Sequence, residues 1–129
     1  MEKIKLPQNI LDILKPGADL KKKLILAKGL YPGVDGFSLL HILLFLLVDS
    51  STEVKSAAEN TLLEMPENML LEQLKKDQIN PHLLHFFSDK KRENERVIEA
   101  IVLNRSTSNK TFSQIISFCN EKKILKCKN

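Results

Sequence analysis

Cysteine is scarce in this chain, and its position limits the chemistry that the chain can offer. The 129 residues include two cysteines, Cys119 and Cys127, and both fall in the last segment. A disulfide framework or a pair of CxxC metal knuckles needs more cysteines than this. We predict a protein without metal or cofactor, in a reducing, cytoplasmic compartment.

Aromatic residues and glycine-rich loops are also sparse. The chain has no tryptophan, one tyrosine and four glycines. Gly33 and Gly36 lie three residues apart with no Lys-Ser or Lys-Thr after them, which excludes a phosphate-binding loop. No G-x-S-x-G elbow or HExxH motif occurs, and Cys119 has no evident base. Since no set of nucleophile, base and orienting group can be assembled, we predict that the chain is not an enzyme.

The chain lacks a hydrophobic run of membrane-spanning length. The longest run covers residues 37–48 and is interrupted only by Ser38 and His41. A spanning helix needs roughly 20 apolar residues. Residues 1–7 are charged and end in proline, where a signal peptide needs an apolar stretch. We expect neither a membrane span nor secretion, and we interpret His41 as a neutral imidazole bonded to a backbone carbonyl inside a buried helix.

The composition is that of an ordinary globular protein. Hydrophobic residues make up 43% of the chain and charged residues 28%. The length suits one domain with a continuous core, so we predict a single domain over residues 1–129. A net charge of +4 favours weak attraction to anions over dedicated nucleic-acid binding.

Apolar residues recur at helical spacing between short polar breaks that carry capping residues and prolines. In the second such segment we place Lys21, Lys22, Lys23 and Lys28 on the polar face. In the last segment we expect the apolar residues to be buried, namely Phe112, Ile115, Ile116 and Phe118. No strand-like alternation accompanies the helical pattern, so the chain is predicted to be all-α. Helices are expected at about residues 7–15, 18–30, 37–48, 52–65, 67–76, 81–89, 93–103 and 110–122.

The polar breaks recur at a nearly constant interval. Turns begin at Asp49, Asp77 and Asn104, which are 28 and 27 residues apart, and each separates two aliphatic helices. Such regularity is typical of helical repeats. It favours a stack of helix hairpins over an irregular bundle.

Residues 49–58, with the sequence DSSTEVKSAA, resemble the inter-helix turn of HEAT repeats. The turns at residues 77–84 and 104–112 are similar to those of the related leucine-rich-variant repeats, which carry an Asp or Asn, small polar residues and a Pro before the next helix. Lys55 stands where HEAT repeats prefer Arg, and Ser108 where the variant repeats prefer Pro. The resemblance implies a short right-handed α-solenoid of about seven to eight helices. It also implies a scaffold that binds other macromolecules.

Two polar clusters invite a functional interpretation. His82, His85 and Asp89 share one face of a predicted helix at spacings that permit metal binding, although a solvated polar face explains them better. Basic clusters at residues 75–76, 90–92 and 122–123 fall at predicted helix ends, where cations offset the helix dipole. If stacking brought those ends together, they would form a lysine-rich edge able to hold phosphates.

We therefore predict a non-enzymatic scaffold that mediates protein–protein interaction with another, unidentified protein. The alternative is a nucleic-acid-associated module that uses the lysine-rich edge, and the scarcity of aromatic residues for base stacking argues against it. The predicted binding surface consists of polar residues chosen by helical phase: Lys55, Glu59, His82, His85 and Lys90.

Overall fold

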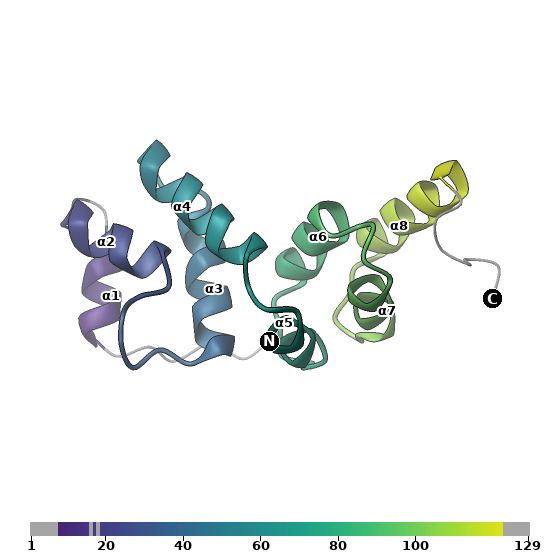
Figure 1. Ribbon diagram of the computed structural model, residues 1–129, viewed down its shortest axis with the longest axis horizontal. Helices are drawn as coiled ribbons and strands as arrows, with labels where there is room; N and C mark the ends of the chain where they lie inside the picture. The colour runs from purple at the N-terminus through teal and green to yellow at the C-terminus, as the bar shows by residue number, and fades with distance from the viewer. Residues whose placement is uncertain (1–7, 16, 18, 123–129) are drawn as a thin grey trace. The chain divides into compact units, whose positions relative to one another are not determined.

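The computed structural model describes residues 8–15, 17 and 19–122, with the side chains of this range up to residue 118. Within these residues the chain forms eight α-helices and no strand, which confirms the all-α prediction (Figure 1). The predictions that involve Pro7, the Cys119 side chain, Cys127 and Lys123 lie outside the described residues. The helices are α1 (Gln8–Leu14), α2 (Leu20–Ala27), α3 (Gly36–Leu46), α4 (Thr52–Leu63), α5 (Glu67–Leu74), α6 (Pro81–Lys90), α7 (Glu95–Leu103) and α8 (Asn109–Lys122).

Short polar side chains fix where the helices begin. The carboxylate of Asp35 accepts the Ser38 N–H before α3, and the Ser51 hydroxyl accepts the Val54 N–H before α4. Such bonds satisfy N–H groups that the first helical turn leaves without a partner. Asn80 caps α6 in the same way, with a proline in the first helical turn as the sequence predicted.

The chain divides into two compact units, one up to Met65 and the other from Pro66. The N-terminal unit holds the helix pairs α1/α2 and α3/α4, and α2 lies along α4. Lys23 near the start of α2 contacts Asp49 just before α4, and Ala27 at the end of α2 contacts Thr61 near the end of α4. The two helices therefore run in the same direction.

Close packing at the C-terminal end of α2 depends on a glycine. Gly29 has a φ of 74°, and a Cβ atom there would lie 3.3 Å from Cγ2 of Thr61. The Thr61 hydroxyl lies 2.5 Å from the carbonyl oxygen of Ala27 and 2.8 Å from that of Ala57. A side chain at position 29 would crowd the Thr61 methyl group and would also strain the left-handed backbone.

The C-terminal unit consists of the four helices α5 to α8. Helix α5 lies beside α7, and α6 contacts both α7 and α8. The N-cap residue of α7, Asn94, donates to Glu67 at the start of α5, and the C-cap residue Asn104 donates to the carbonyl of Leu74 at its end. The N-terminal ends of α5 and α7 are therefore in contact, as are their C-terminal ends, so the two helices are parallel.

The buried stripes of α2 and α8 differ from the sequence prediction. Lys23 was placed on the polar face of its helix, but it is 6% exposed and lies inward with Leu26 and Ala27. A lysine can occupy this position because its ammonium group reaches Asp49, as described below. Ile116 was predicted to be buried and is 56% exposed. None of the described helices is both long and apolar enough to cross a membrane.

Candidate binding surfaces

The predicted surface residues of the N-terminal unit lie one turn apart on α4. Lys55 is exposed and Glu59 is half-buried. They follow Ser51, whose hydroxyl starts the helix, and Glu53, whose charge suits its first turn. This pair can form part of a polar contact surface.

In the C-terminal unit only part of the predicted surface faces outward. His82 is exposed in the first turn of α6, and Lys90 is exposed at its end. His85 is half-buried, and its Nδ1 lies 2.9 Å from the hydroxyl of Thr111 on α8. His85 therefore joins two helices, and its Nδ1 is occupied within the unit. The sequence could not reveal this, because Thr111 lies 26 residues further along the chain.

The histidines do not assemble a metal site among the residues that the structure describes. No group of three His, Cys, Asp or Glu side chains there is placed to hold an ion. His41 is accounted for by a contact of 2.8 Å between its Nδ1 and the carbonyl oxygen of Phe37. A carbonyl oxygen can only accept, so Nδ1 carries a proton, and the predicted bond to the backbone is confirmed.

A buried ion pair joins the two helix pairs of the N-terminal unit. Nζ of Lys23 donates to Oδ1 of Asp49 over 2.9 Å, and each of the two side chains is 8% exposed. The bond from Lys23 holds the pKa of the Asp49 carboxyl below its ordinary value, against the opposing effect of burial. A bond from the Ser51 N–H acts in the same direction as Lys23. Both charges are used within the fold, so this pair is structural.

The basic clusters of the C-terminal unit are separated. Lys75 and Lys76 follow α5 at the end where Asn104 bonds the carbonyls of Leu74 and Lys76. Residues 90–92 precede α7 and lie at its opposite end. A helix of nine residues such as α7 is about 13 Å long. The two clusters therefore do not form one continuous edge.

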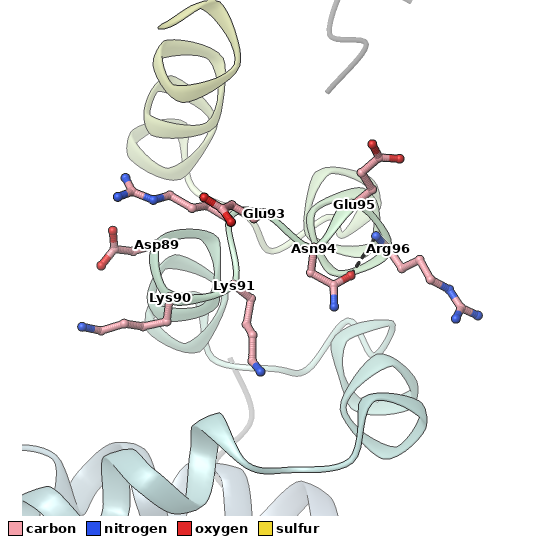
Figure 2. A pocket seen from close by; sticks show the side chains of 8 residues that line it. Asp89, Lys90, Lys91, Glu93, Asn94, Glu95 and Arg96 are labelled. Atoms are coloured by element: carbon pink, nitrogen blue, oxygen red, sulfur yellow. Dashed lines mark hydrogen bonds between the residues drawn. The ribbon is translucent and has the colours of Figure 1, made fainter. Parts of the chain in front are cut away.

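A wide, open pocket of about 810 Å³ surrounds the loop between α6 and α7. It is lined by residues 89–96, which carry charges of both signs. Figure 2 shows the side chains of Lys90, Lys91 and Arg96 pointing in different directions. The guanidinium of Arg92 lies 5.0 Å from the centroid of the Phe118 ring. In a ligand site the polar groups point toward a common centre. The side chains of Lys90, Lys91 and Arg96 do not, so this pocket is a poor candidate for a ligand site.

Two further grooves run between neighbouring parallel helices. The groove between α2 and α4 has a volume of about 530 Å³ and is lined mostly by polar residues, including Glu53, Ser56 and Asn60. The groove between α5 and α7 has a volume of about 420 Å³. Its lining residues are Leu71, Lys75, Arg96, Glu99, Ala100, Leu103 and Asn104. Sequence reasoning missed both grooves, because each is formed by helices that lie far apart in the chain.

Comparison of the chain with family models, with curated proteins and with solved structures found no match.

Proposed function

We propose that the chain is a cytoplasmic, non-enzymatic scaffold in which stacked helix pairs form a short HEAT-like solenoid that binds another protein. The observation that carries this proposal is the recurring contact between successive helix pairs. In the C-terminal unit, hydrogen bonds join side chains to groups 26 to 30 residues earlier in the chain, in both layers of helices. In the N-terminal unit, Lys23 and Asp49 are joined across 26 residues. Bonds over a similar number of residues in both units are expected of repeats that pack on their neighbours.

The surfaces that remain exposed when the helices pack together support a binding function. Lys55, His82 and Lys90 are exposed, and polar or mixed grooves follow the helix pairs. The buried charges of Lys23 and Asp49 neutralise each other within the fold. Binding through an extended surface requires only such a stable frame.

The test is quantitative capture of partners by the full-length chain. Wild type is compared with a variant in which Lys55, His82 and Lys90 are each replaced by Glu. A second variant carries Lys110→Glu, which changes an exposed charge at the start of α8, outside the predicted surface. We expect a protein that is recovered by wild type and by the Lys110 variant, and that falls at least about tenfold in the triple variant. Equal recovery by all three would reject this surface, and the absence of any specific partner would reject the scaffold function.

The alternative function, nucleic-acid binding, has less geometric support because the basic clusters lie at opposite ends of α7. It predicts retention on heparin that falls steeply as salt rises, since bound phosphates release counterions. Substitution of Lys75 and Lys76 by Glu should then abolish the retention. Retention that does not respond to salt would exclude this function.

A further inference from the structure

The groove between α5 and α7, called here the α5/α7 groove, combines an apolar floor with charged residues at its edges. Leu71 of α5 is half-buried and Ala100 of α7 is 7% exposed, and together they form the floor. Leu103 stands at one edge and is 74% exposed. A large apolar residue therefore faces solvent at the edge of a groove with an apolar base. Exposed apolar surface next to a concave site is typical of a protein-binding surface.

The charges around this groove differ in whether they already have partners. The guanidinium of Arg96 donates to Glu67 over 3.0 Å, so its charge is used within the unit. Lys75 and Glu99 both line the groove, and neither has an ion-pair partner among the described residues. Lys75 lies at the C-terminal end of α5, and Glu99 lies one turn before Leu103 on α7. The groove thus offers a cation at one end and an anion further along.

We propose that the α5/α7 groove binds an amphipathic helix of a partner protein. The groove lies between two parallel helices, and a third helix fits such a depression by inserting apolar residues spaced three and four apart. An apolar residue of the occupant packs against Leu71 and Leu103. An acidic residue pairs with Lys75 and a basic residue pairs with Glu99.

The charges also set the direction of the bound helix. An acidic residue is most favourable in the first turn of a helix, where the dipole is positive. Since that residue pairs with Lys75 at the C-terminal end of α5, the occupant runs antiparallel to α5 and α7. This inference rests on the proposed scaffold function and specifies the kind of partner that one surface accepts.

The first step of the test is selection of binders from a phage library of 16-residue peptides on the immobilised full-length chain. We expect enriched sequences with apolar residues at positions i, i+3 or i+4, and i+7, and with Asp or Glu in the first turn. An enriched peptide is then synthesised with a fluorescent label, and its affinity is measured by anisotropy. A library that yields no enriched sequence overturns the proposal.

The apolar contact is tested with two matched substitutions. Leu103→Gln removes the apolar edge of the groove, and we expect it to weaken peptide binding by at least about tenfold. Leu30→Gln makes the same change at a residue that is 69% exposed in the N-terminal unit, and it should leave the affinity unchanged. Circular dichroism of both variants verifies that the fold is retained.

The charge contact is tested by a charge swap. Lys75→Glu should weaken binding by about five- to tenfold, and changing the acidic residue of the peptide to Lys should restore it. Lys28→Glu is the matched control, since Lys28 is an exposed residue at the C-terminal end of α2 that lines the α2/α4 groove. Binding that responds to Lys28→Glu and not to Lys75→Glu would place the peptide in the other groove. That result rejects this inference and leaves the scaffold function standing, whereas the scaffold function fails only if partner capture fails.

Discussion

The two units hold corresponding turns in chemically different ways. Asp49 follows α3 and Asn104 follows α7, and each accepts the N–H of the residue two positions later, Ser51 and Ser106. Each side chain also reaches back to the preceding helix pair. Asp49 accepts from the ammonium of Lys23, whereas Asn104 donates to the carbonyl of Leu74 over 2.6 Å and to that of Lys76 over 3.0 Å.

The group that each side chain bonds explains why one turn has Asp and the other has Asn. A carboxylate can only accept, which suits the cation in the N-terminal unit, and an amide can donate, which suits the two carbonyls in the C-terminal unit. The residue after α3 and the residue after α7 therefore play similar roles, while the charge of each suits the group that it bonds. Asp and Asn have nearly the same shape, so exchanging them tests this account without changing the packing volume.

The largest effect is expected from Asn104→Asp. The side chain is buried, and a carboxylate there would face two carbonyl oxygens with no donor of its own. We expect the free energy of unfolding at neutral pH to fall by about 3–5 kcal/mol, the cost of an uncompensated buried charge. Urea denaturation followed by circular dichroism measures it. Acid should reduce the loss, because protonation restores a donor, and a loss below about 1 kcal/mol at neutral pH would contradict this account.

Asp49→Asn should have a smaller effect. The amide oxygen can still accept from Lys23, which bonds Oδ1 of Asp49, but the NH2 group then replaces Oδ2, the oxygen that accepts the Ser51 N–H. The change therefore loses the bond to Ser51 and the negative charge opposite the lysine, while the lysine keeps an acceptor. We expect a loss of about 1.5–3 kcal/mol. Tyr31 is the only tyrosine of a chain without tryptophan, and it lies in the N-terminal unit, so its fluorescence reports unfolding there. A variant as stable as wild type would show that the charge of Asp49 is unnecessary.

The sequence predicted the helices well because their signals are local. Apolar periodicity and capping residues lie within a few positions of each helix, and the turns at Asp49 and Asn104 were recognised from such residues. The groups that bond these turn residues could not be predicted from local signals. Lys23 was assigned to the polar face because a lysine is seldom buried without a partner, and its partner lies 26 residues away.

The candidate surfaces show the same limit. His82 and Lys90 are exposed as their helical phase predicted, whereas Nδ1 of His85 is hydrogen-bonded to the hydroxyl of Thr111. The α5/α7 groove needs Leu71 and Leu103 side by side, and neither residue stands out in its own segment. Sites built from helices that lie far apart in the chain depend on how those helices pack, which the sequence pattern alone does not supply.

A buried amide distinguishes the C-terminal unit in a further way. Gln73 on α5 is 7% exposed, and its Oε1 has no hydrogen-bond partner among the described residues. A methionine has a similar length and leaves no polar atom to satisfy. We expect Gln73→Met to raise the free energy of unfolding by about 1 kcal/mol, measured by urea denaturation. Glu72→Met, an exposed change on the same helix, is the control and should give no such gain.

The smallest expected effect is a difference in acid sensitivity between the two turns. The pKa of Asp49 is lowered in the folded state, chiefly by the hydrogen bond from Lys23. At pH values above about 3.9, the ordinary pKa of an aspartate, the ionised carboxylate therefore stabilises the folded protein. This contribution is lost as the pH falls through the lower folded pKa. The difference in unfolding free energy between wild type and Asp49→Asn should therefore stay constant from about pH 7 to 5 and shrink below about pH 4. Asn104 does not titrate, so the corresponding difference between wild type and Asn104→Ala should show no such change. A difference for Asp49→Asn that persists undiminished at pH 3 would mean that its charge does not supply the stabilisation.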